Sequence, residues 1–293
     1  MSKVETPADS FIDDLFRLDN FVQVTLEGFG YSLHAERVTD TIRSIVTRDK
    51  NARPHPVADD AVYAKEKERA KKLGDFARSE ATAGHPYLFS LAVIRLYSIV
   101  EGAVDATFIA AVRSREDCRL SDTLTRLKGP LLPFLISTED ERAEILRDRL
   151  LDEVGARQKV GLGRFEAILS AISLAGRSIP ELISRSFLEF SETRHLIVHR
   201  GGFADKKFIG RCPWLAEKVG QPVKISGAEF RIYSSTSMWY LIDLAQRWRG
   251  GNDPEVSAEY AQVQNEVLNS INENYRGARD RSTTDASNTP VAD

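Results

Sequence analysis

The chain has 293 residues, 42% of them hydrophobic and 28% charged, and its 40 basic and 43 acidic side chains give a net charge of −3. This near-balance excludes a polybasic coat protein for nucleic acid, and the apolar content excludes a disordered acidic chain. Two cysteines, Cys118 and Cys212, are too few for a disulfide-stapled secreted domain. Because the polar amino terminus has no signal-peptide core, we expect a cytoplasmic globular protein of one large domain or two small ones.

The first eighty residues predict a mostly helical region, 1–82, whose role the residues do not indicate. Residues 9–27 carry apolar side chains at helical spacing after Ser10, a candidate N-cap, although the β-branched run 21–26 is equally typical of a strand. Residues 58–80 are dense in charge, which is typical of a solvated helix or a connector.

A long apolar helix is predicted from Pro86, in the first helical position, to about Val112. Between residues 88 and 112 it carries only three charged side chains, Arg95, Glu101 and Asp105. A membrane-spanning helix tolerates three charges poorly, so we interpret this segment as the buried central helix of a bundle and expect no membrane partner.

Caps, prolines and apolar stripes predict four further helices, over residues 138–154, 164–174, 180–200 and 234–249. Two short segments, 222–225 and 229–233, flank Ser226-Gly227 and predict a β-hairpin. Beyond the last of these helices we expect a polar helix over 251–277 and a disordered tail over 278–293.

The amphipathic helices predict a mainly α fold, an up-and-down helical bundle over residues 83–250 with a short hairpin after the fourth helix. The sequence has no glycine-rich dinucleotide or phosphate loop and no nucleophile elbow. This excludes Rossmann-type, P-loop and α/β-hydrolase enzymes.

An arginine interrupts the apolar stripe of the helix 180–200. The stripe has the spacing i, i+4, i+7, i+14 and consists of Ile183, Phe187, Phe190 and Ile197. Arg194 takes position i+11, where a guanidinium is costly unless it is paired or faces an opening. Local violations of this kind are typical of functional sites.

Two histidines follow the arginine on the same helix. His195 and His199 are one turn apart and share a side of the helix. His199 lies in the last turn before two glycines, where the helix dipole favours the protonated form that a general acid needs.

The motif from Arg194 to His199 resembles the signature of HEPN domains: an arginine, a polar residue, three variable residues and a histidine, late on a bundle helix. The resemblance extends over 83–250 through the upstream apolar helix, the Gly-Gly-Phe-Ala-Asp-Lys-Lys-Phe stretch, the hairpin and the closing helix. The same loose spacing recurs over 48–55 and 78–85, but only the motif combines an amphipathic helix, a polar second residue and a glycine stop.

The resemblance implies a metal-independent endoribonuclease that needs no cofactor. RNA supplies the 2′-hydroxyl nucleophile, so the enzyme provides proton transfer and charge stabilisation at phosphorus. By this resemblance His199 is the general acid or base, Arg194 holds the scissile phosphate, and His195 orients His199 or shares proton transfer. The products are a 2′,3′-cyclic phosphate and a 5′-hydroxyl. A homodimer with a composite active site, a role as a toxin or anti-phage effector, and an antitoxin or other regulatory partner are also implied.

Local charge is consistent with an RNA site. Residues 192–218 contain six basic and three acidic side chains, an excess that is also common on ordinary surfaces. Arg200, Lys206 and Lys207 are the candidate substrate-binding residues.

Other interpretations of the motif remain open. In one interpretation, Arg194 forms a structural ion pair with Glu101 or Glu192. His195 and His199 have the spacing of zinc ligands, although no third ligand is evident, and we expect no metal. A non-catalytic HEPN-like module that dimerises or binds a nucleotide or a partner, and a purely helical scaffold, are the alternatives to an enzyme.

Overall fold

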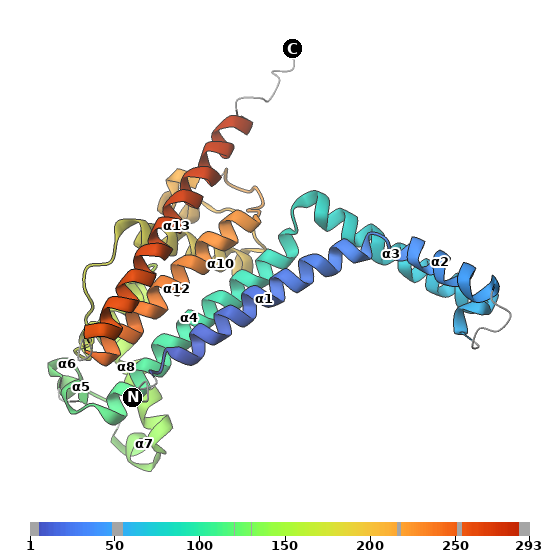
Figure 1. Cartoon of the computed structure of the whole chain (residues 1–293). Helices are drawn as coiled ribbons and strands as arrows, with labels where there is room; N and C mark the ends of the chain where they lie inside the picture. Colours follow the sequence, from blue (N-terminus) through green and yellow to red (C-terminus); the bar gives the residue numbers. More distant parts are fainter. Residues whose placement is uncertain are drawn as a thin grey trace. The chain divides into compact units, whose positions relative to one another are not determined.

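Helices account for most of the chain, and no strand is formed among the residues described. The computed structural model describes residues 6–48, 55–119, 121–129, 131–215, 218–250 and 254–286. In chain order (Figure 1) the α-helices are α1 (Asp9–Ser32), α2 (Ala35–Arg48), α3 (Asp60–Ala83), α4 (Pro86–Ser114), α5 (Glu116–Arg119), α6 (Asp122–Arg126), α7 (Leu131–Ile136), α8 (Glu139–Glu153), α9 (Gly163–Ala171), α10 (Glu181–Arg200), α11 (Lys206–Arg211), α12 (Gly227–Arg249) and α13 (Pro254–Ala286). Three short 3-10 turns are Pro56–Ala58, Ala156–Gln158 and Pro213–Leu215.

The chain divides into two compact units. The larger consists of residues 1–18 and 90–293, and the smaller of residues 19–89. The division falls within α1 and α4, whereas the sequence placed a boundary at residue 82. Since helices bridge both boundaries, no loop of distinctive composition marks the division.

Aromatic rings hold together the core of the larger unit, where α4, α9, α10 and α12 meet. Phe187 and Phe190 of α10 are fully buried, with ring centroids 5.3 Å apart. Tyr97 of α4 lies 5.6 Å from Phe190, and Tyr240 of α12 lies 6.0 Å from Phe187. Such edge-on and tilted pairs stabilise a core beyond the area they bury, so α10 is fixed between α4 and α12.

Helix α4 confirms the long apolar helix predicted from Pro86. By length and composition alone it is able to cross a membrane, and 56% of its most apolar stretch is buried inside the protein. Its fully buried side chains include Val93, Leu96, Val100 and Phe108. These are the contacts of a core helix.

The predicted hairpin is wrong at its second strand. Residues 229–233 lie in the first turns of α12, which begins with Ser226 as N-cap. Ser226 and Glu229 form a capping box, in which each side chain accepts a hydrogen bond from the other residue's backbone N–H, and this starts a helix where a strand was predicted. The extended stretch before it forms one isolated bridge, between Phe203 and Pro222.

The other predicted helices are found with shifted ends. The capping box of Thr138 and Glu141 starts α8 as expected. The β-branched run 21–26 is helical, within α1. The polar helix expected over 251–277 is α13, which continues to Ala286, into the segment expected to be disordered. Residues 287–293 lie outside the described part of the chain.

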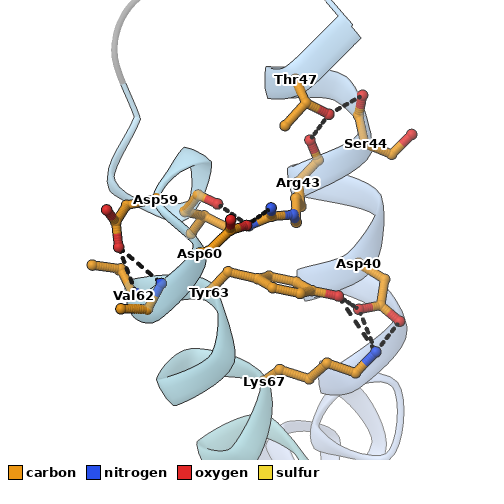
Figure 2. Close-up of polar contacts among 11 residues, drawn as sticks. Asp40, Arg43, Ser44, Thr47, Asp59, Asp60, Val62, Tyr63 and Lys67 are labelled. Carbon is orange, nitrogen blue, oxygen red and sulfur yellow. Dashed lines mark hydrogen bonds and ion pairs between the residues drawn. The ribbon is translucent and has the colours of Figure 1, made fainter.

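The smaller unit is built on packing between α2 and α3, with polar contacts across the pair. Figure 2 shows Asp40 of α2 accepting a hydrogen bond from the Tyr63 hydroxyl at 2.6 Å and pairing with the Lys67 ammonium at 2.9 Å. Arg43 stacks 4.2 Å from the centre of the Tyr63 ring and pairs with Asp60. The two bonds that Asp40 accepts lower the pKa of its carboxyl and keep it ionised.

Candidate functional site

Helix α10 ends where the sequence predicts, and its end places the motif at the protein surface. Gly201 adopts the left-handed conformation (φ +62°) that glycine tolerates, and its N–H bonds to the Leu196 carbonyl. The last two turns before this stop carry Arg194, His195 and His199.

Arg194 lies on the buried stripe of α10, as its position predicts. Ile183, Phe187 and Phe190 on the same stripe are fully buried, and Arg194 is half-buried beyond them. Its guanidinium carbon is 5.0 Å from the centre of the Tyr97 ring on α4, a cation–π contact. Its Nε is buried and has no hydrogen-bond acceptor.

The two acids considered as partners of Arg194 are paired with other arginines. Glu101 forms an ion pair with Arg164 of α9 at 3.4 Å, and Glu192 forms one with Arg211 of α11 at 2.5 Å. Among the described residues no carboxylate pairs with Arg194, so the prediction of a structural ion pair with Glu101 or Glu192 is wrong. The guanidinium keeps N–H donors for a ligand.

The two histidines lie against each other. Their ring centroids are 4.8 Å apart, with His195 half-buried and His199 exposed. Burial lowers the pKa of His195 most, and the nearby His199 lowers it further. Glu192 opposes these effects, and Lys207 and Asp205 make smaller contributions that lower and raise the pKa, respectively. His195 is therefore neutral near pH 7 and able to accept a proton.

Arg194 and the histidines occupy adjoining but separate positions on α10. Within the described part of the chain, no hydrogen bond or ring contact joins Arg194 to His195 or His199, since the guanidinium lies over Tyr97 instead. A phosphate group that contacted both the Arg194 guanidinium and the histidine rings would have to span the distance between them.

The predicted substrate-binding residues differ in whether an ion pair occupies their charge. Lys206 and Lys207 are exposed in the first turn of α11, which follows the motif directly. Arg200 instead lies 3.6 Å from Asp205, the residue that caps α11. The two lysines are thus the stronger candidates for contacts with an anionic substrate.

The chemistry of the described residues bears on metal binding as well. No cluster of three His, Cys, Asp or Glu side chains able to hold a metal ion occurs among them. Cys118 and Cys212 are both buried, and they form no disulfide. The histidine pair therefore has no third ligand within reach in the part of the chain described.

Sequence reasoning missed Tyr97. The residue is 7% exposed, and burial together with the nearby Glu101 charge raises the pKa of its phenol, so it stays neutral. In the sequence Tyr97 is one of several apolar positions on a long helix, and only the packing of α4 against α10 shows that its ring supports Arg194.

Comparison with known proteins adds no family. No family model, no curated protein and no solved structure matches this chain significantly. The resemblance to HEPN domains accordingly rests on the motif and its surroundings in the sequence.

Proposed function

We propose that the chain is a metal-independent endoribonuclease of the HEPN type. The observation that carries the proposal concerns Arg194, a half-buried guanidinium that pairs with no carboxylate among the described residues. It directly precedes His195 in the sequence, and the His195 and His199 rings lie against each other. A buried arginine that serves only the fold is normally paired. Here the unused donors and the two histidines supply the groups that cleavage of RNA requires.

The proposed reaction is transfer of a phosphodiester within the RNA chain. His195, neutral because burial lowers its pKa, takes the proton of the 2′-hydroxyl, and the oxygen attacks phosphorus. His199, exposed beside it, gives a proton to the departing 5′-oxygen as the P–O5′ bond breaks. Arg194 binds the phosphoryl oxygens and stabilises the charge of the transition state. A 2′,3′-cyclic phosphate and a 5′-hydroxyl result.

The proposal includes the expected partners. Lys206 and Lys207 contact the flanking phosphates of the RNA. Two protomers join their motifs across a two-fold axis, which makes one groove from two half-sites. A toxin or anti-phage role in the cytoplasm, held in check by an antitoxin or another regulatory partner, is the biological setting that the HEPN resemblance implies.

A second candidate is a non-catalytic HEPN-like module. The position of Arg194 over Tyr97, away from His199, favours it, because a guanidinium used for packing needs no contact with the histidines. In this case the motif serves dimerisation or binding of a nucleotide or a protein partner.

Cleavage of RNA by purified protein in the presence of a chelator distinguishes the two. We expect wild type to cut single-stranded RNA, and Arg194→Ala and His199→Ala to be inactive. Two controls match these changes. Arg185→Ala removes an arginine of the same helix that also stacks on an aromatic ring, 4.2 Å from the Trp214 centroid. His55→Ala removes an exposed histidine from one of the two other Arg–His pairs with this loose spacing, Arg48 and His55. Both controls should cut normally, and a wild type that cuts no RNA would establish the non-catalytic module.

A further inference from the structure

A cavity lies in the larger unit, at the C-terminal end of α12. Its volume is about 550 Å³, within the range of small-molecule sites. It is lined by the loop from Ser173 to Arg177, by the last turns of α12, and by Arg115 just beyond α4. No motif residue lines it, so it is independent of the proposed ribonuclease site.

Three arginines and one carboxylate line this cavity: Arg115, Arg177, Arg247 and Asp243. The side chain of Arg247 is only 5% exposed. Its Nη1 donates to Glu166 at 3.0 Å and its Nη2 lies 2.5 Å from Asp243, whereas its Nε has no acceptor. Glu166, which pairs with Arg247, and Asp117, which pairs with Arg115, lie outside the lining, so the lining itself presents three guanidinium groups and one carboxylate.

The other two guanidinia are held in place and still keep free donors. Arg177 donates from Nη2 to the side chains of Gln246, at 2.8 Å, and Gln264, and its Nε lies 3.8 Å from Asp243. Arg115 donates to Asp117 from Nε at 3.2 Å and from Nη2 at 2.8 Å, and to the Trp248 carbonyl from Nη1 at 3.2 Å. A guanidinium has five N–H donors, so both retain N–H groups for a ligand. Guanidinia fixed in this way lose little side-chain entropy when they bind.

The loop that faces the arginines has an unusual backbone. Ser173 has φ +62°, a left-handed conformation that is strained for a residue other than glycine. Gly176 lies so close to Arg247 that a Cβ atom there would overlap the guanidinium. The loop is thus shaped around Arg247, and strain of this kind is concentrated at functional sites.

We propose that this cavity binds a small molecule that carries a phosphate group. Phosphate oxygens accept paired hydrogen bonds from planar guanidinia, and three guanidinia meet at this one cavity, of which Arg115 and Arg177 keep unused N–H donors. The single carboxylate, Asp243, orients Arg247 through their ion pair. A purely structural ion-pair network at this end of α12 is the competing explanation.

Calorimetric titration of the full chain with pyrophosphate, and separately with inorganic phosphate, tests the proposal. We expect wild type to bind pyrophosphate and its melting temperature to rise with ligand. Arg177→Gln should weaken binding about tenfold or more, because a charge-assisted hydrogen bond is lost. The side chain of Arg177 is 53% exposed, so this variant should fold normally.

Arg157→Gln is the matched control. Its guanidinium is 57% exposed and pairs with Asp152 at 2.6 Å in the same unit, but it does not line the cavity. Gly176→Ala, which displaces Arg247, should weaken binding as Arg177→Gln does. Absence of pyrophosphate binding to wild type, or equal weakening by Arg157→Gln, would overturn the proposal. So would a single-stranded RNA without terminal phosphates that binds more tightly than pyrophosphate and depends on Arg177.

Discussion

Replacing Arg194 by methionine should abolish RNA cleavage while changing the stability of the fold only a little. The change removes the charge from the apolar stripe of α10 and keeps an unbranched side chain against Tyr97. For most catalytic residues the loss of activity and the loss of stability are hard to separate. Among the described residues, however, no carboxylate pairs with Arg194, so removing Arg194 leaves none of them unpaired.

The magnitude follows from two opposing contributions. Loss of the cation–π contact with Tyr97 costs about 0.5–2 kcal/mol of the free energy of unfolding. Removal of the buried Nε, which has no acceptor, returns about 1–3 kcal/mol. The net change therefore lies between about 1 kcal/mol of destabilisation and about 2.5 kcal/mol of stabilisation. In a unit of this size, each kcal/mol shifts the melting temperature by about 2–4 °C.

Thermal and urea unfolding, with RNA cleavage measured on the same preparations, check this prediction. Arg164→Met is the contrasting variant, because it leaves Glu101 partly buried and unpaired and should lower the melting temperature. If Arg194→Met destabilises the protein as much as Arg164→Met does, Arg194 has a structural partner and the argument fails. If Arg194→Met cuts RNA at the wild-type rate, Arg194 is not catalytic.

Three further predictions concern pH. Burial lowers the pKa of His195, so as pH falls the cleavage rate should stay high to below pH 6.5 and drop only when the His195 imidazole becomes protonated. Comparing the NMR titration of wild type with that of His195→Gln identifies which signal belongs to His195. Hydrogen bonds from Tyr63 and Lys67 lower the pKa of Asp40 below its unfolded value. The stabilisation that these bonds give is therefore present above the unfolded pKa and lost as pH falls through the folded pKa, so circular dichroism should show wild type losing α2–α3 structure in acid where Asp40→Asn is insensitive to pH. Burial raises the pKa of Asp105 to about 6 in spite of its 2.7 Å ion pair with Arg147, so its carboxyl signal in NMR should titrate near pH 6, and a midpoint below pH 4 would contradict the burial.

The helices that the sequence predicted best are those with strong end signals. Pro86 starts α4, Thr138 and Glu141 cap α8, and Gly201 ends α10, each as expected from local chemistry. The start of α12 has the same type of signal, Ser226 three residues before a glutamate, although the segment 229–233 predicted a strand there. Capping is a hydrogen-bonding arrangement that fixes a boundary, whereas β-propensity depends strongly on context.

The site was predictable only as far as one helix determines it. The spacing of Arg194, His195 and His199 on α10 follows from helical periodicity, and the structure keeps all three at the end of that helix. The partners of the arginine depend on how α4 and α9 pack on α10. Sequence alone did not indicate that Glu101 pairs with Arg164 or that Tyr97 lies under Arg194, because these residues are far apart along the chain.

Packing also changes the meaning of the local charge excess around the motif. The six basic residues between 192 and 218 look equivalent in the sequence. In the structure Arg211 is committed to Glu192 and Arg200 to Asp205, whereas among the described residues Arg194, Lys206 and Lys207 form no ion pair. Glu192 and Asp205 thus neutralise two of the cations and leave Arg194, Lys206 and Lys207 without an ion pair in the part of the segment that the structure describes. A chain with a net charge of −3 can in this way hold a few phosphates at one point without attracting nucleic acid over its whole surface.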